Sequence, residues 1–197
     1  MQKRFSYYDR LSAAEKATYR KSDAIAEVVL PDPSALAPRV AELEAALASG
    51  KRLATARAST ALVTAMTKQL GVSAVTVKVR NVRPEYGGGE LHGLYTFAEK
   101  GETPTIEVWM RTAANARVVR FRTFLRTLIH EVLHHLDVTL FELDDSFHTE
   151  GFFRRESALV RKLAPKVETA QPLAPTTERE AHPSLPRQLD LFATSRG

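Results

Sequence analysis

Two histidines and the glutamate that follows the first of them are the side chains of this sequence best suited to chemistry. His130, Glu131 and His134 form an HExxH pattern. Residues four apart lie on one face of an α-helix, so two imidazoles at this spacing can converge on a single metal ion. The spacing predicts zinc-dependent hydrolysis: neutral imidazoles hold Zn²⁺, and Glu131, a carboxylate outside the ligand set, takes a proton from water.

The segment around this pattern must be helical for that geometry to hold. Apolar side chains recur through it at helical spacing, at Phe121, Phe124, Leu125, Leu128, Ile129, Val132 and Leu136. This periodicity predicts a buried helix that begins near Val118. The alternative is a chance match on a core helix whose histidines bind backbone carbonyls. The metal-binding interpretation is favoured over a chance match, because the helical periodicity, the histidine spacing and the glutamate all agree with it.

A tetrahedral catalytic zinc needs a third protein ligand. His148 is the favoured candidate, because the connection that follows Asp137 is long enough to end one helix and reverse the chain before a second helix opens. Glu156 on that second helix is the rival ligand, and Asp144 and Asp145 are more remote alternatives.

Two neighbours of the pattern are candidates for supporting roles. His135 points about 100 degrees away from His134 on a helix, so we expect it at the surface or behind a ligand. Asp137 could accept an imidazole N–H and so orient a ligand, or it could be a solvated carboxylate at the helix end.

These residues resemble the SprT/Spartan group of zinc metalloproteases, in which HExxH is followed downstream by HGxxF. Here His148 precedes Phe152 by four positions, but Thr149 stands in the place of the family's glycine and a glycine occurs at position 151. The family's frequent four-cysteine ribbon is also missing, because the chain has no cysteine. The resemblance covers about residues 55–163. It implies a minimal zincin-like domain that cuts proteins associated with or crosslinked to DNA.

The length and composition of the chain limit the kinds of protein that it could be. A length of 197 residues allows one core-bearing domain with tails, and a formal net charge of +5 suits an anionic partner such as DNA without requiring one. The absence of cysteine excludes disulfides and thiol catalysis. No signal peptide or membrane span is apparent, so we expect a cytoplasmic, nucleoid-associated protein without a membrane partner.

Helices are expected before the catalytic segment. Ser12 and Glu15 read as a capping box that opens a helix running to about Val29. A second helical region begins near Pro38 and ends before Gly71, with a possible division at Gly50.

Three strands and the two helices of the site complete the predicted α+β fold. The strands are expected at 75–80, 91–97 and 105–110, with a flexible hairpin connection at 87–89. The predicted organisation is a helical region at 1–54, the peptidase domain at 55–163 and a disordered tail at 164–197.

The strands also suggest where a substrate would lie. Zincin substrates extend along a sheet edge, so either 91–97 or 106–110 is expected to be that edge. His92 reads as a hydrogen-bonded strand histidine. Tyr95, Arg154 and Arg155 are open candidates for stabilising the oxyanion, and arginines around the site could form a basic rim.

The proline-rich tail contains a short apolar motif. Its residues are Gln188, Leu189, Asp190, Leu191 and Phe192. They resemble at all five positions the peptide by which bacterial polymerases and repair factors bind the sliding clamp. Leu191 and Phe192 would fill an apolar pocket, and the flexible linker would give reach. The alternative is that this patch folds back onto its own domain.

The favoured reading is therefore a zinc metallopeptidase held near replicating DNA by the sliding clamp, with proteins as substrates. Two other functions stay open. One is a clamp-binding or DNA-binding adaptor whose zinc is structural, and the other is a repressor-cleaving stress metalloprotease with an irrelevant tail.

Overall fold

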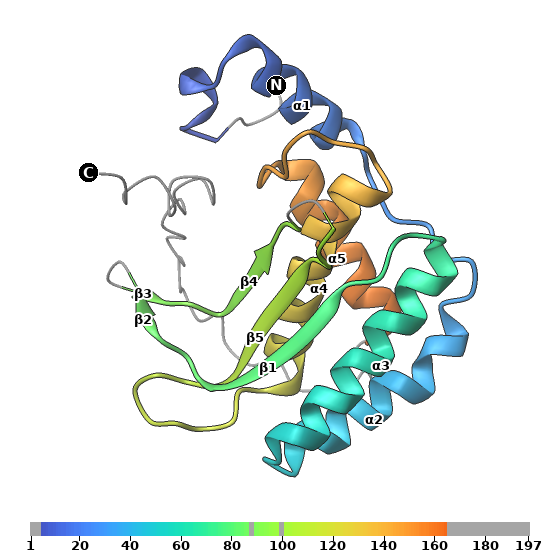
Figure 1. Ribbon diagram of the computed structural model, residues 1–197, viewed down its shortest axis with the longest axis vertical. Helices are drawn as coiled ribbons and strands as arrows, with labels where there is room; N and C mark the ends of the chain where they lie inside the picture. Colours follow the sequence, from blue (N-terminus) through green and yellow to red (C-terminus); the bar gives the residue numbers. More distant parts are fainter. Residues whose placement is uncertain (1–4, 87–88, 99–100, 165–197) are drawn as a thin grey trace, which may run out of the picture.

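The computed structural model describes residues 5–86, 89–98 and 101–164, and within them the chain is α+β (Figure 1). The helices of this part are α1 (Ala13–Ala24), α2 (Ala37–Ala48), α3 (Arg52–Leu70), α4 (Phe121–Thr139) and α5 (Glu150–Leu163), with short 3-10 turns at Tyr8–Arg10 and Ser34–Leu36. The strands are β1 (Thr76–Val82), β2 (Glu85–Tyr86), β3 (Gly89–Glu90), β4 (Gly93–Thr96) and β5 (Thr105–Arg111).

The first helix starts as predicted. The Ser12 hydroxyl accepts a hydrogen bond from the backbone N–H of Glu15 at 3.3 Å, and the Glu15 carboxylate accepts one from the N–H of Ser12 at 2.7 Å. This reciprocal capping box satisfies two donors that the first turn of a helix leaves free. The predicted end near Val29 is wrong, because α1 stops at Ala24.

A side chain of α5, distant in sequence but adjacent in space, explains why α1 stops at Ala24. One Arg155 nitrogen donates to the carbonyl oxygens of Ser22, at 2.6 Å, and of Ile25, at 3.0 Å. Arg155 thus supplies these carbonyls with the hydrogen-bond donor that the backbone N–H groups of a further helical turn would otherwise provide. Beyond them the chain is extended and buries Val28 and Leu30 in alternation.

The second helical region is divided at Gly50, as the sequence suggested. Pro38 occupies the first turn of α2, where its missing N–H costs nothing. Gly50 and Gly71 both have a left-handed φ of 67°, and they end α2 and α3 respectively. The boundary expected between residues 54 and 55 falls inside α3.

The three-stranded sheet has the order β1-β5-β4, with β1 parallel and β4 antiparallel to β5. Of the two segments considered as an edge, β5 is therefore central and that prediction is wrong for 106–110. β4 lies at an edge of this sheet. β2 and β3 pair separately and form the expected hairpin, whose residues 87–88 lie outside the described ranges.

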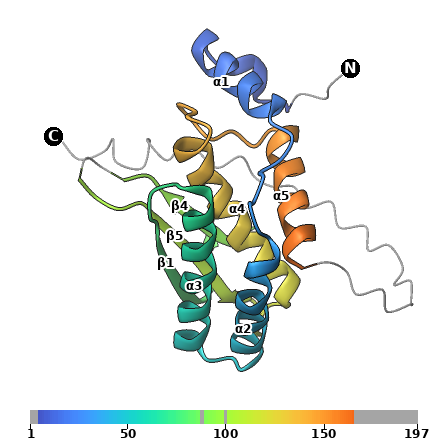
Figure 2. The ribbon, with the colours of Figure 1, turned by 90° about the vertical axis from the view of Figure 1, so that its right-hand side faces the viewer.

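Helices cover one face of this sheet (Figure 2). Ile106, Val108 and Met110 alternate along β5 and are fully buried on that face, against α4, whereas the intervening residues are partly exposed. α3 packs against β1 and α5 packs against α4. The HExxH segment is thus held on the central helix, α4, of one continuous core.

The sequence also predicted that the chain has no membrane-spanning helix and that it ends in a tail. No helix within the described ranges has the length and apolar character needed to span a membrane. The expected tail lies outside those ranges from residue 165 onward, and so does the sliding-clamp motif at 188–192.

Candidate metal centre

α4 brings two of the predicted ligands together. His130 and His134 are one turn apart on this helix, and their ring centroids lie 4.9 Å from each other. α4 has no glycine or proline between residues 121 and 139, and its apolar stripe is buried in the core. The two imidazoles are therefore presented from a rigid element.

The third histidine comes from the loop that enters α5. Its Nε2 atom lies 2.9 Å from Nε2 of His130 and 3.2 Å from Nε2 of His134. Ligands 2.0–2.1 Å from a tetrahedral zinc are separated by about 3.3 Å, so this spacing suits one ion shared by three imidazoles. His130, His134 and His148 are the group in the described residues close enough to hold a metal ion.

The protonation of the first two rings supports that reading. Nδ1 of His130 lies 2.9 Å from a carboxylate oxygen of Glu156, which can only accept, so Nδ1 carries the proton. Nδ1 of His134 lies 2.7 Å from the Ser146 hydroxyl, and that hydroxyl donates to Asp137 at 2.7 Å. With Nδ1 as the donor, the neutral form of each ring turns an Nε2 lone pair toward the same point, where a cation is the natural partner.

The electrostatics of the two α4 histidines differ. Burial lowers the pKa of His130, but its hydrogen bond to Glu156 and the charges of Glu131 and Glu156 outweigh this, so the net shift is upward. Burial lowers the pKa of His134 well below its ordinary value, and the neighbouring His130 and His148 lower it further. His134 is thus held neutral, which is the form that binds a metal.

Phe152 forms an apolar floor beneath the three imidazoles. Its ring centroid lies 4.9 Å from those of His130 and His134 and 5.2 Å from that of His148. The predicted pairing of His148 with Phe152 is confirmed. Phe152 is fully buried, so the ligands are backed by a surface that excludes water on that side.

Glu131 lies between α4 and the edge strand β4. Its side chain is buried, and a methyl group added to Gly93 would come within 2.8 Å of its Cγ and Cδ atoms. Burial raises the pKa of Glu131 to about 7; the charge of His130 and a hydrogen bond from the backbone of Tyr95 oppose the rise. A pKa near neutrality suits a group that takes up and returns a proton.

A buried chain of hydrogen bonds extends behind His134. Ser146 links the imidazole to Asp137, and the second oxygen of Asp137 lies 2.8 Å from an Arg155 nitrogen. The side chains of Asp137 and Arg155 are fully buried. The expected support of a ligand by Asp137 therefore runs through a serine hydroxyl.

The rival ligands have other partners. Glu156 is not among the three converging residues; it orients His130 through Nδ1 and binds Arg126. Asp144 accepts a hydrogen bond from Thr18, and Asp145 accepts one from the backbone of Ser146. The geometry thus favours His148 as third ligand.

The surface position considered for His135 is wrong. This residue is fully buried, and its Nε2 lies 2.9 Å from the Ser73 carbonyl, which makes Nε2 the donor. Nδ1 then accepts from the Tyr95 hydroxyl at 3.2 Å. Tyr95 also stacks on His134, with ring centroids 6.3 Å apart, while its hydroxyl is bonded to His135.

The other candidates for an oxyanion role are also engaged elsewhere. Arg155 is buried against Asp137, and Arg154 donates to the Asp23 carbonyl at 2.8 Å. Both arginine side chains are therefore held by other partners. His92 precedes β4 instead of lying within it, and its backbone carbonyl accepts from the N–H of Trp109.

Sequence reasoning missed three residues of the site. Gly93 leaves room for Glu131, Ser146 connects His134 to Asp137, and Gly151 gives close contact between α5 and α1. A glycine within an alternating strand is a usable signal for close approach, and it stands at position 93 of the expected strand 91–97. The role of Ser146 has no comparable signal, because it depends on how the loop returns.

Comparison with known proteins gives no further identification. No family model matches the chain, and neither the curated proteins nor the solved structures contain a match.

Proposed function

We propose that this protein is a zinc metallopeptidase. The observation that carries the proposal is the convergence of the Nε2 atoms of His130, His134 and His148, with the buried carboxylate of Glu131 on the same helix. A purely structural site would have no need of an acidic group in this position. Three imidazole ligands with one further coordination position are typical of catalytic zinc.

The donor set fits zinc better than the hard metals. Three neutral imidazoles suit zinc and its neighbours in the first transition series, whereas magnesium and calcium prefer oxygen ligands. When bound, zinc supplies Lewis acidity, which lowers the pKa of a coordinated water to about 7 and polarises a substrate carbonyl.

The protein's own residues supply the proton transfers and the orientation. Glu131 accepts a proton from the attacking water and delivers it to the leaving amine. Glu156 and Ser146 hold His130 and His134 with their Nε2 atoms turned inward. Such partners commonly change metal affinity 10- to 100-fold, roughly, when they are removed.

The edge strand β4, beside Glu131, is the proposed binding site of the peptide substrate. β4 pairs with β5 along one side, and Gly93 of β4 lies against the Glu131 carboxylate. An extended peptide that adds to the side of β4 away from β5 would bind through backbone hydrogen bonds, with little demand on sequence. This arrangement suits an enzyme that cuts many different proteins.

We extend the proposal to proteins bound or crosslinked to DNA, with the sliding clamp as tether. Its support is the resemblance to the SprT/Spartan group, the net charge of +5 and the motif at 188–192. Arg155 does not belong to the basic rim that we considered, because it is buried in an ion pair. Contacts with phosphate would fall to exposed arginines such as Arg117, Arg120 and Arg126.

The deciding experiment separates metal binding from catalysis. His148→Ala should lose zinc, measured by elemental analysis after dialysis, whereas Glu156→Ala should retain it with weakened affinity. Glu131→Gln should keep zinc and lower cleavage of a DNA-bound protein by at least ~100-fold. The reverse zinc result would replace His148 with Glu156 as ligand. Full zinc with no cleavage by the unmodified protein, with or without DNA, would favour the adaptor.

A further inference from the structure

The N-terminal segment, residues 5–24, lies across the loop that delivers His148. We call this segment the N-terminal clamp. Figures 1 and 2 both show α1 beyond the loop between α4 and α5, apart from α2 and α3. Among the helices, α1 packs chiefly against α5. The clamp is thus peripheral to the core yet close to the third ligand.

Tyr7 binds the third ligand's own backbone. Its hydroxyl donates to the carbonyl oxygen of His148 at 2.8 Å. Its ring stacks on Phe147 with centroids 6.4 Å apart, and Tyr19 of α1 packs on the same phenylalanine at 6.1 Å. The residue before the ligand and the ligand's peptide group are therefore both held by the clamp.

The end of α1 holds the residues that follow His148. The Asp23 carboxylate accepts from the backbone N–H of Gly151 at 2.8 Å, and the hydroxyls of Ser22 and Thr149 lie 3.4 Å apart. A methyl group at Gly151 would lie 2.5 Å from the Asp23 carbonyl oxygen and 2.7 Å from that of Ser22. Only a glycine lets α5 begin this close to the backbone of α1.

A second route connects the clamp to another ligand. Arg155 binds the Ser22 carbonyl on one side and Asp137 on the other. Asp137 binds Ser146, which in turn binds His134. This route starts at the C-terminal end of α1 and ends at the imidazole of His134.

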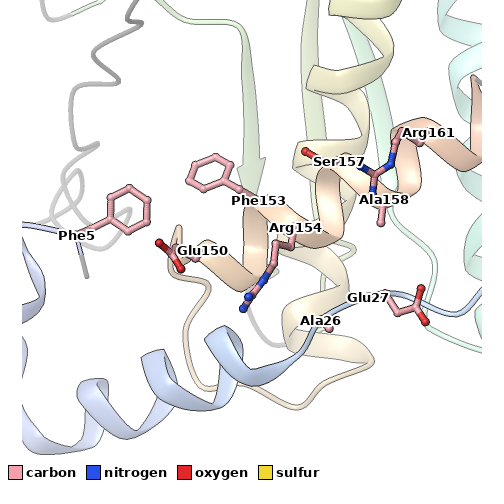
Figure 3. Close-up of a pocket in the computed structure, with 9 residues that line it drawn as sticks. All are labelled: Phe5, Ala26, Glu27, Glu150, Phe153, Arg154, Ser157, Ala158 and Arg161. Carbon is pink, nitrogen blue, oxygen red and sulfur yellow. The ribbon is translucent and has the colours of Figure 1, made fainter. Parts of the chain in front are cut away.

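The contact between the clamp and α5 is open along its outer side. A groove of about 610 Å³ lies there. Figure 3 shows Phe5 of the clamp and, just beyond the clamp, Ala26 and Glu27 around the side chains of α5 that line this groove. Phe5 meets Phe153 of α5 at a centroid distance of 5.9 Å. The clamp is thus open on this outer side, while the end of α1 is bonded to the start of α5 and Tyr7 to the loop.

We infer that the N-terminal clamp is a positioning element of the metal centre. By holding the backbone on both sides of His148, Tyr7 and Asp23 place its imidazole against those of His130 and His134. The clamp thereby sets the metal affinity, while α4 keeps its two ligands without it. This inference rests on the proposed binding of zinc by the three histidines.

The test compares zinc affinity and amide exchange in conservative variants of the full chain. Tyr7→Phe removes the hydroxyl and keeps the ring, and it should weaken zinc binding by about 3- to 10-fold. Tyr7→Phe with Asp23→Ala should weaken it by on the order of 10- to 100-fold. Tyr8→Phe is the matched control, because the Tyr8 hydroxyl binds Arg20 of the clamp itself. Affinity is measured by competition with a chromophoric chelator.

Hydrogen exchange of the metal-free proteins keeps the inference separate from the proposed function. The amides of Gly151, Phe152 and Phe153 should exchange faster in both clamp variants than in Tyr8→Phe, with no change in α4. Unchanged exchange at these amides contradicts the proposed role of the N-terminal clamp in holding the start of α5. This outcome is decisive even if the parent protein binds no zinc and the proposed function fails. Parent-like zinc affinity in the double variant overturns its role in metal binding.

Discussion

Gly93→Ala tests whether the edge strand β4 and the Glu131 carboxylate are in direct contact. The three heavy atoms nearest to an added methyl group all belong to Glu131, with Cγ and Cδ at 2.8 Å. Carbon atoms normally approach to about 3.5–4.0 Å, so the glutamate must shift by about 1 Å. Gly93 is not among the glycines with positive φ, so alanine meets no backbone strain there.

Two magnitudes follow from that shift. Overpacking of a buried site costs about 1–3 kcal/mol, which for a chain of this size lowers the melting temperature by about 2–4 °C per kcal/mol. A misplacement of ~1 Å in a catalytic group can lower the rate on the order of 100-fold. Zinc content should not change, because no ligand is touched.

A double-mutant cycle with Glu131→Ala isolates the contact. Urea unfolding should show that Gly93→Ala costs about 1–3 kcal/mol in the parent and less than about 0.5 kcal/mol when Glu131 is already alanine. Gly71→Ala is the control: its φ is 67° and its added methyl group meets nothing within 4 Å. It should therefore cost the same in both backgrounds. An equal cost of Gly93→Ala in both would refute the proposed contact.

Two further predictions concern the buried ion pair and the tail. Asp137→Asn should destabilise the protein by about 3–5 kcal/mol in urea unfolding, because it leaves the buried Arg155 charge without its partner, and Arg155→Met with Asp137→Asn should recover part of that loss. A loss below about 1 kcal/mol would contradict this. Replacing Leu191 and Phe192 with alanine should abolish binding to a bacterial sliding clamp in a pull-down while zinc content is kept, with hot-spot losses of about 2 kcal/mol each; parent protein that fails to bind would rule out the tether.

The convergence of the three histidines could be predicted from the sequence, largely because local spacing determines it. His130 and His134 are neighbours on any helix, and the apolar periodicity of 121–136 predicts that helix. The length of the connection placed His148 correctly near the start of the next helix. The rivalry with Glu156 could not be decided in this way, because spacing does not show which ring nitrogen a side chain approaches.

The residues that orient the ligands depend on long-range packing. His135 is buried because its ring nitrogen meets the carbonyl of Ser73, 62 residues earlier in the chain. Arg155 reaches Ser22 across 133 residues. Helical periodicity reports only which face of α4 a residue occupies, so it could not supply these partners.

The residues at the start of α5 and the N-terminal clamp have a common physical explanation. Thr149 caps α5, because its hydroxyl accepts from the backbone N–H of Phe152 at 2.9 Å. A glycine there has no side chain for this bond or for the contact with Ser22. Gly151 then stands where α5 touches the carbonyls of α1, at a position that admits no larger residue without movement. A threonine at position 149 followed by a glycine at position 151 therefore suits a chain whose N-terminal helix rests on the start of α5.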